Sequence, residues 1–312
     1  MQFHTHTNRG ILRLTGPDQC TFLQGLITND INKASADTTL YSALLTPQGK
    51  FLYDFFVFVI GGALYIECEK DRLSALQTHL NKFKLRSDVN LSDVTDQWQS
   101  ISLFGENAHA LFNLKLQTGQ TSLFEDGIAF VDPRLKELGV MVILPRTTKI
   151  PKILTENATE VSFGLYDQHR LLLGIPDGSR DMLPDKAIPL ECNLDALNAI
   201  DWNKGCYMGQ ELTSRTKHLG IVRKRLLPVE FDGDTLPFLT PLTFQGRKVG
   251  TMRTSVKDVG VKGAGLALIR LEILESGECP RLFTPENVEI TPRLPEFLHS
   301  LLTVRTTTSV RD

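Results

Sequence analysis

The run KGCYMGQE, residues 204–211, combines the residue types that a reactive thiol needs. Two glycines flank Cys206, and glycine allows positive φ and close approach of the backbone to a ligand. The following segment, QELTSRTKH, predicts a helix, so Cys206 lies just before a helix N-terminus with Lys204 two residues away. Both features favour a thiolate, which is a nucleophile and a soft metal ligand. A buried free cysteine would instead be inert, so the interpretation depends on exposure.

Asp54 is a second candidate, because it interrupts the apolar run FLYDFFVFVI, residues 51–60. In a strand, Tyr53 and Phe55 would face the core and Asp54 the other side. That side is either solvent or a cleft, where the carboxylate could bind an amine-bearing ring or move a proton. Period-2 alternation does not distinguish the two, and both remain open.

The five cysteines are Cys20, Cys68, Cys192, Cys206 and Cys279. Their number is odd and no two form a CxxC pair, which argues against a disulfide framework and against a zinc site. The N-terminus has no apolar segment typical of a secretory signal. These features predict no bound metal and a cytoplasmic location.

The basic residues that follow Glu211 form a cluster: Arg215, Lys217, His218, Arg223, Lys224 and Arg225. Such a cluster is either a polyanion site or a solvated face. It lacks interleaved aromatic residues and the formal net charge of the chain is −2, so we expect no nucleic-acid partner.

The elements that must position these residues indicate an α+β fold. Strands are expected near residues 11–14, 99–104, 127–131 and 140–144, and as a hairpin within 51–66 that is too short to span a membrane. Amphipathic periodicity predicts a helix over 70–85, and a further helix is expected near 107–116. Regularly spaced short strands after residue 225 predict a β-barrel, which divides the chain into residues 1–225 and 226–312.

Several ordered motifs resemble the YgfZ family. KGCYMGQE is similar to its Lys-Gly-Cys-Tyr/Phe-x-Gly-Gln-Glu signature, and HRLLLGIPDG and IPLECNLDALNAIDWN resemble its Arg-containing and Pro-x-Glu-x-Asn segments. FLQGLITNDI and ALLTPQGKFLYDFFVF resemble its opening motifs. ELTSRTKHLGIVRKRL resembles the branch that contains the mitochondrial iron–sulfur assembly factor. The resemblance runs in order from Gly10 to Leu268.

This family is related to the glycine-cleavage T-protein. The relation implies a cloverleaf of two α+β modules and a C-terminal β-barrel around a central folate cavity. Asp54 corresponds to one of the T-protein's two adjacent aspartates, and Arg170 to the arginine of its Arg-Leu-Glu-Ala-Gly segment. Leu172 replaces the glutamate of that segment, which weakens pterin recognition because a buried N–H would lose its acceptor.

The resemblance implies a tetrahydrofolate-binding accessory factor for assembly or repair of iron–sulfur proteins. Cys206 would be the reactive thiol, and Lys204 would favour its thiolate by charge. Partners would be reduced folate and iron–sulfur proteins or their assembly machinery. The expected cofactor-binding residues are Asp54, Arg170, Glu191, Asn193, Tyr207, Gln210 and Glu211.

Two alternatives remain. One is a tetrahydrofolate-dependent aminomethyltransferase or demethylase, which the retained Asp54 favours and Leu172 and the cysteine motif disfavour. The other is a scaffold that docks partner proteins through the basic cluster after Glu211. Whether the protein catalyses a covalent reaction is left open by the sequence.

Overall fold

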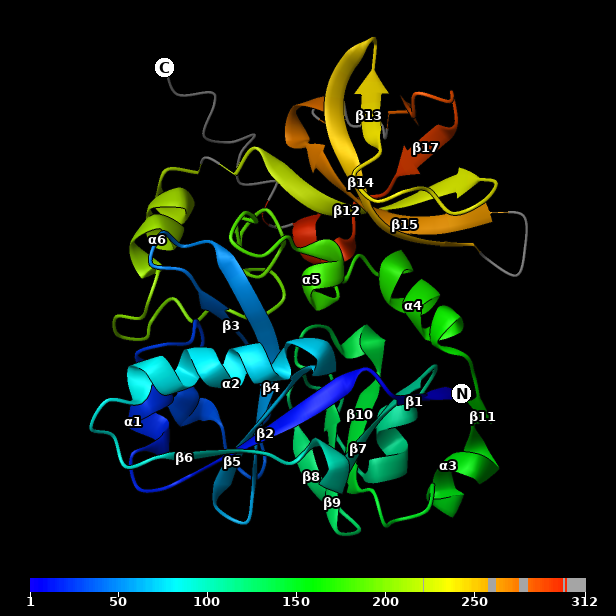
Figure 1. Cartoon of the computed structure of the whole chain (residues 1–312). Coiled ribbons are helices and arrows are strands. Elements are labelled where there is room, and N and C mark those ends of the chain that lie inside the picture. Colours follow the sequence, from blue (N-terminus) through cyan, green and yellow to red (C-terminus); the bar gives the residue numbers. More distant parts are fainter. Residues whose placement is uncertain (221, 258–261, 275–279, 300, 302–312) are drawn as a thin grey trace. The chain divides into compact units, whose positions relative to one another are not determined.

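A computed structural model describes residues 1–220, 222–257, 262–274, 280–299 and 301 (Figure 1). Contacts between residues divide the chain into two compact units. Unit 1 contains residues 1–48, 52–163 and 197–210, and unit 2 contains residues 49–51, 164–196 and the described residues from 211 onward.

Unit 1 contains a five-stranded sheet with the order β3-β4-β5-β2-β6. Its strands are β2 (Arg9–Thr15), β3 (Leu40–Leu45), β4 (Phe51–Ile60), β5 (Ala63–Glu69) and β6 (Asn90–Asp93). The expected hairpin is confirmed: β4 and β5 pair antiparallel across Gly61 and Gly62, which both have positive φ, as glycine allows in a tight turn. Short helices flank the sheet at α1 (Gln19–Gln24), η1 (Ile31–Lys33) and η2 (Thr95–Gln97).

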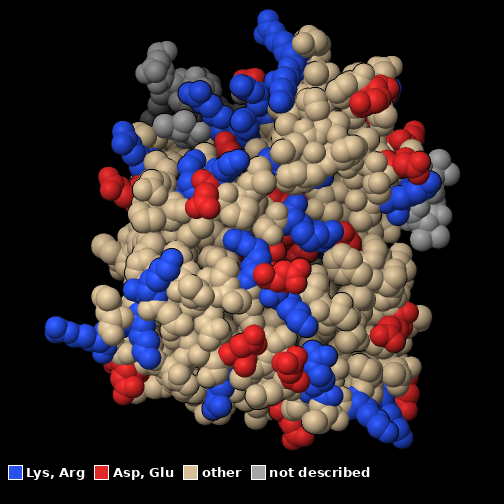
Figure 2. Space-filling model, viewed as in Figure 1, with Lys and Arg blue, Asp and Glu red and all other residues tan. Residues whose placement is uncertain are grey.

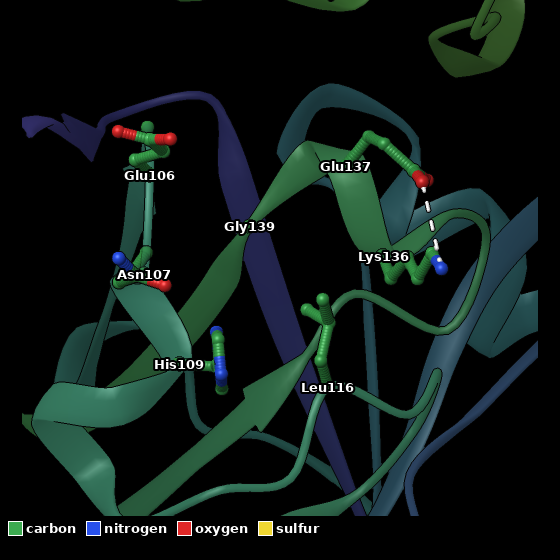
Figure 3. Close-up of a pocket in the computed structure, with 9 residues that line it drawn as sticks. Glu106, Asn107, His109, Leu116, Lys136, Glu137 and Gly139 are labelled. Carbon is green, nitrogen blue, oxygen red and sulfur yellow. Dashed lines mark ion pairs between the residues drawn. The ribbon is translucent and has the colours of Figure 1, made fainter.

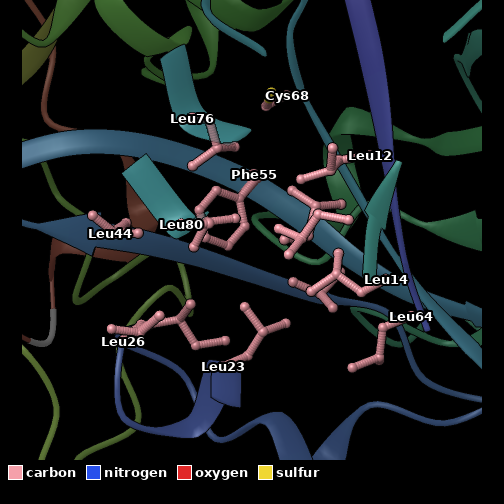
Figure 4. Close-up of a cluster of buried hydrophobic side chains, with 14 of the residues drawn as sticks. Leu12, Leu14, Leu23, Leu26, Leu44, Phe55, Leu64, Cys68, Leu76 and Leu80 are labelled. Atoms are coloured by element: carbon pink, nitrogen blue, oxygen red, sulfur yellow. The ribbon is translucent and has the colours of Figure 1, made fainter. Parts of the chain in front are cut away.

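Helix α2 (Lys70–Lys84) covers one face of this sheet, and the predicted amphipathic helix is confirmed. Its buried residues Leu73, Leu76 and Leu80 follow the 3.6-residue period that places side chains on one stripe. They join a core cluster with Phe55 of β4 and with leucines of β2, β5 and α1 (Figure 4).

The second sheet of unit 1 has the order β11-β1-β7-β10-β9-β8. Its strands are β1 (Gln2–His6), β7 (Trp98–Phe104), β8 (Thr121–Phe124), β9 (Gly127–Val131), β10 (Val140–Pro145) and β11 (Thr159–Glu160). Helices α3 (Lys152–Asn157), η3 (Ala108–Phe112) and η4 (Lys136–Leu138) accompany it. The helix expected near 107–116 is only the short 3₁₀ helix η3, because Asn107 and Asn113 adopt left-handed backbone conformations at its two ends.

The face of β4 opposite α2 packs against the second sheet. The Phe56 ring lies 5.7 Å from that of Phe130, and the Phe58 ring lies 6.3 Å from the same residue, between ring centroids. Both faces of β4 are therefore covered, and its alternating side chains enter two different interiors.

Unit 2 contains the helices α4 (Phe163–Leu172) and α5 (Gly178–Asp181), most of α6 (Gln210–His218), η5 (Leu271–Leu274) and a closed barrel. The strand order in the barrel is β12-β15-β14-β13-β16-β17. Its strands are β12 (Lys224–Asp232), β13 (Pro241–Phe244), β14 (Arg247–Lys257), β15 (Lys262–Arg270), β16 (Leu282–Phe283) and β17 (Glu289–Pro292). The α+β class and the C-terminal barrel are thus confirmed, while the division at residue 225 and the central folate cavity stay predictions.

Leu76→Ala is expected to lower the free energy of unfolding by about 2–5 kcal/mol, because it removes a fully buried side chain from the α2 core and leaves a cavity. Leu123→Ala is the matched control, since Leu123 is 76% exposed and its truncation should cost about 0.5 kcal/mol or less. Urea unfolding of both variants measures the change in the free energy of unfolding. Equal midpoints for the two variants would contradict the assignment of the core.

Candidate functional site

Cys206 is exposed on a loop of unit 1, residues 197–210. Apart from its chain neighbours, a Cβ atom added at Gly205 would meet nothing within 4 Å, so the space beside Gly205 is open. Gly209, with φ of 80°, turns the chain into α6, whose first amide, that of Gln210, donates to the Tyr207 carbonyl at 3.2 Å. The predicted helix directly after the cysteine motif is confirmed.

The Lys204 ammonium is bound by backbone oxygens. Its Nζ donates to the carbonyls of Gln24 at 2.8 Å, Ile27 at 2.6 Å and Asn29 at 2.8 Å. The residue is 8% exposed, and the Tyr207 ring centroid lies 5.1 Å from Nζ. Burial lowers the pKa of Lys204 to about 8, against the opposing charges of Asp30 and Asp201. Its expected effect on the Cys206 thiolate stays a prediction.

Further hydrogen bonds join the same loop to the segment that follows α1. They run from Met208 N to Gly25 O (3.1 Å), from Asp201 N to Thr28 O (3.1 Å), from Thr28 Oγ1 to Ala199 O (2.6 Å) and from Asn29 Nδ2 to Asn198 O (2.8 Å). The cysteine loop is therefore attached to a second segment of unit 1 on both sides of Cys206.

Asp54 lies in a buried polar cluster of unit 1 rather than in solvent. It is 8% exposed and its Oδ2 accepts a hydrogen bond from the Tyr41 hydroxyl at 2.8 Å. The Arg134 guanidinium lies 5.8 Å from the Tyr41 ring centroid and 4.9 Å from that of Phe56. Burial, followed by the charge of Asp54, raises the pKa of Tyr41 well above its ordinary value. The solvent-facing alternative for Asp54 is excluded.

Two members of this cluster, Tyr41 and Arg134, were not expected from the sequence. Arg134 also forms a two-bond ion pair with Asp132, at 3.0 and 2.7 Å. Neither residue belongs to a recognisable motif. Arg134 reaches the Tyr41 ring, and so the polar cluster of Asp54, only because the second sheet packs on β4. The presence of a carboxylate in an apolar strand was the signal that a polar partner had to exist.

Arg170 is fully buried in unit 2, where carboxylates surround it. Its Nε donates to Asp167 at 2.6 Å, and its Nη1 donates to Asp181 at 2.5 Å and to the Ile175 carbonyl at 2.9 Å. Burial disfavours the charged form, but Asp181 and Asp167 outweigh it and raise the pKa of Arg170. Among the described atoms, Nη2 is buried without a hydrogen-bond partner.

Asp181 connects this ion network to the barrel. Its carboxylate also accepts from the amides of Asp177 at 2.9 Å and of Thr254 in β14 at 3.0 Å. Arg180 adds ion pairs to Asp167 at 2.7 Å and to Asp177 at 2.8 Å. The Nη1 donor of Arg170 thus joins α4 to α5, and Asp181 joins α5 to β14.

Asn193 and Glu191 lie at the start of the barrel. Asn193 is fully buried with φ of 64°, and its Nδ2 donates to the Leu226 carbonyl in β12 at 2.7 Å. The Leu226 amide donates to the Glu191 carbonyl at 2.9 Å, so both residues hold β12. Burial raises the pKa of Glu191, although Lys224, Lys50, Arg253 and Arg225 act against this shift. The expected folate contacts of Asn193 and Glu191 stay predictions. The expected contact of Glu211, which is exposed in the first turn of α6, also stays a prediction.

The basic cluster after Glu211 does not form one solvated patch. Arg225 is 4% exposed and pairs with Asp195 at 2.5 and 2.9 Å, whereas Arg215, Lys217, His218 and Arg223 are exposed. On the face shown in Figure 2, basic and acidic side chains are interspersed.

A pocket of about 230 Å³ lies elsewhere in unit 1 (Figure 3). Glu106, Asn107, His109, Lys136 and Glu137 are among the residues that line it, and the Lys136 and Glu137 side chains are 3.9 Å apart. None of the predicted site residues lines this pocket, and its charged residues are exposed, so it carries no part of the candidate site.

The four cysteines that the structure describes fall into two classes. Cys20 and Cys206 are exposed, and Cys68 and Cys192 are buried. Burial raises the pKa of both buried thiols, which keeps them protonated and unreactive. Cys279 lies outside the described residues.

Comparison with known proteins identifies two matching regions and a set of similar proteins. Residues 6–148 match the GCVT N-terminal domain, and residues 223–300 match the CAF17 C-terminal beta-barrel domain. The iron-sulfur cluster assembly factor IBA57 homolog of Aspergillus oryzae is 35% identical, over 86% of this chain and 70% of that protein. The human assembly factor IBA57 is 34% identical, over 81% of this chain and 74% of that protein. The chain belongs to the YgfZ/IBA57 family.

The fold of this family member is that of the T-protein. The glycine cleavage system aminomethyltransferase T from Bartonella henselae superposes with a TM-score of 0.76, over 95% of this chain and 86% of that chain, at 16% identity. The expected family and the T-protein-like fold are both confirmed.

The expected cytoplasmic location is wrong for this family. The Aspergillus, Neurospora and human relatives are all named as mitochondrial proteins. An unpaired set of cysteines indicates a reducing compartment but does not distinguish one from another. Among the described residues, no helix is both long and apolar enough to cross a membrane.

Asp181→Asn is expected to lower the free energy of unfolding by about 3–5 kcal/mol, because it removes a buried charge that balances Arg170. Asp234→Asn is the control: Asp234 is 84% exposed in its ion pair with Lys257, and solvent screens such a pair, so its loss should leave the Tm close to that of the parent. Thermal unfolding of the two variants at neutral pH measures the difference. A Tm for Asp181→Asn equal to that of the control would refute a structural role for the network.

Proposed function

We propose that this protein is a tetrahydrofolate-binding accessory factor for the assembly or repair of iron–sulfur proteins and that it acts through Cys206. Relatives at 35% and 34% identity are named iron-sulfur cluster assembly factors, which supports the role. The observation that carries the residue assignment is the exposed thiol at the centre of a loop attached on both sides. Iron–sulfur proteins or their assembly machinery are the partners.

The chemistry of Cys206 suits this role. An accessible thiolate can attack a sulfur atom or bind iron, because it is a nucleophile and a soft ligand. The buried Cys68 and Cys192 can do neither, and Cys20, the other exposed cysteine among the described residues, lies outside the family signature. An iron–sulfur cluster would be cargo in this scheme rather than a resident group.

Reduced folate is the proposed cofactor, supported by the GCVT domain match and the aminomethyltransferase fold. One residue of unit 1 fits a folate. The Asp54 carboxylate is buried and its Oδ2 is held by Tyr41, as suits a group that binds ring N–H donors. With Leu172 in place of a glutamate, Asp54 is the acidic group assigned to the ring.

A tetrahydrofolate-dependent aminomethyltransferase or demethylase is the second candidate. The aminomethyltransferase fold and the buried Asp54 favour it. Release of methylene-tetrahydrofolate from methylated amines would distinguish it, because the accessory role requires no such turnover.

Cys206→Ser is expected to abolish support of iron–sulfur enzymes while leaving the fold intact. A serine hydroxyl is neither a thiolate nor a soft ligand at neutral pH, and the stability change should be about 1 kcal/mol or less. The measurement is the activity of iron–sulfur enzymes in cells that lack the native copy. Cys20→Ser, at equal expression, is the matched control and should restore those enzymes. Restoration by Cys206→Ser as well would remove the thiol from the mechanism.

The protein is expected to bind tetrahydrofolate in preference to oxidised folate, and Asp54→Asn is expected to weaken binding at least about tenfold, since it removes a buried charge next to the ring. Titration calorimetry measures the affinity of the parent protein for the two folates and the affinity of Asp54→Asn for tetrahydrofolate. A ligand at a hundredfold excess over its Kd should also add about 2.7 kcal/mol of stability. Absence of heat and of any Tm shift with the parent protein would refute the folate assignment.

A further inference from the structure

We propose that Lys204 is a positioning residue whose ammonium fastens the Cys206 loop to the segment 24–29, and that it does not act by activating the thiol. This inference rests on the proposed function of Cys206. We call Lys204 Nζ and the carbonyls of Gln24, Ile27 and Asn29 the lysine clamp.

Only a lysine satisfies the geometry of the clamp. The carbonyls at the C-terminal end of α1 and in the turn after it lack helical partners, and three of them lie within 2.6–2.8 Å of one nitrogen. An ammonium carries three donors around a single atom and meets all three. The donors of an arginine are spread over a rigid planar fork and cannot converge on one point.

The same contacts leave Lys204 poorly suited to activate Cys206. Its three N–H groups are taken by the three carbonyls, so no donor is left for the sulfur. Its charge is also offset by Asp30 and Asp201, of which Asp201 pairs in addition with Lys33. Among the described residues, the hydrogen bonds of Lys204 are thus made to the backbone of the segment 24–29 and not to the thiol.

Position is what the clamp supplies. Lys204 holds the loop two residues before Cys206, and the Met208 amide, bound to the Gly25 carbonyl at 3.1 Å, holds it two residues after. Between these anchors Cys206 and Gly205 are exposed, and the space beside Gly205 is open. The two attachments therefore determine where the thiol meets a partner.

The test compares Lys204→Met, which removes donors and charge, with Lys204→Arg, which keeps the charge and loses the convergent donors. Lys82→Met is the control that removes an exposed charge of α2, outside the clamp. Three quantities are measured: hydrogen exchange of the Asp201 and Met208 amides, the pH profile of Cys206 alkylation by iodoacetamide, and iron–sulfur enzyme activity in cells lacking the native copy. Alkylation is followed on the peptide that contains Cys206.

Both Lys204 variants should exchange the two amides at least about tenfold faster than the parent, as expected for a loop that opens locally. The midpoint of their alkylation profiles should stay at the parent value, and both should lose enzyme support with the thiol still present. Lys82→Met should match the parent in all three measurements. Thr28→Val, which removes the bond from Thr28 to the Ala199 carbonyl, should raise amide exchange of the loop with Lys204 untouched.

If Lys204 instead activates the thiol by its charge, Lys204→Arg should behave as the parent. Lys204→Met should then move the alkylation midpoint to higher pH and leave amide exchange unchanged. Either result would overturn the proposal. If Lys204→Met does not fold, Lys204→Arg and Thr28→Val decide by the same criteria. Cys206→Ser is measured in parallel. Enzyme support by Cys206→Ser would refute the proposed function, whereas the exchange data would still decide on the clamp.

Discussion

Coverage of β4 on both faces is the constraint on which the organisation of unit 1 depends. Helix α2 occupies one face of this strand and the second sheet the other, so every side chain of its central part enters an interior. An ionisable residue in such a strand must find a partner, because a buried carboxylate without one is costly. Asp54 finds the Tyr41 hydroxyl, and the arrangement turns an isolated charge into a buried polar cluster.

Arg170 of unit 2 and Lys204 of unit 1 are buried charges that are satisfied in two different ways. Arg170 is balanced by carboxylates, which join helices α4 and α5 to the barrel strand β14. Lys204 is instead satisfied by backbone carbonyls, which are dipoles rather than opposite charges. Removing a partner from either set leaves a buried charge or buried carbonyls unsatisfied, so both sets hold their segments firmly. Firm attachment of flanking segments is what lets an exposed residue such as Cys206 keep a defined position.

The described cysteines divide into two that are buried by packing and two that are exposed to solvent. Cys68 and Cys192 are core residues that happen to contain sulfur, and burial keeps them protonated. Cys206 is exposed because its neighbours Lys204 and Tyr207 turn inward while Gly205 leaves space beside it. A loop that buries its long side chains and presents its short one is suited to contact with a protein partner.

The sequence by itself determined the elements and the family. Hydrophobic period fixed α2 and the β4–β5 hairpin, turn residues and strand spacing indicated the barrel, and the ordered motifs indicated the family, because these signals depend on residues close together in the chain. It did not determine the surroundings of Asp54, since alternation along a strand does not reveal whether a second sheet covers the far face. Nor could it show that the Lys204 ammonium is bound by Gln24, Ile27 and Asn29, because those contacts are made by backbone carbonyls, which every residue type carries. Tertiary structure alone decided these points, by bringing distant segments together and by exposing one thiol while burying others.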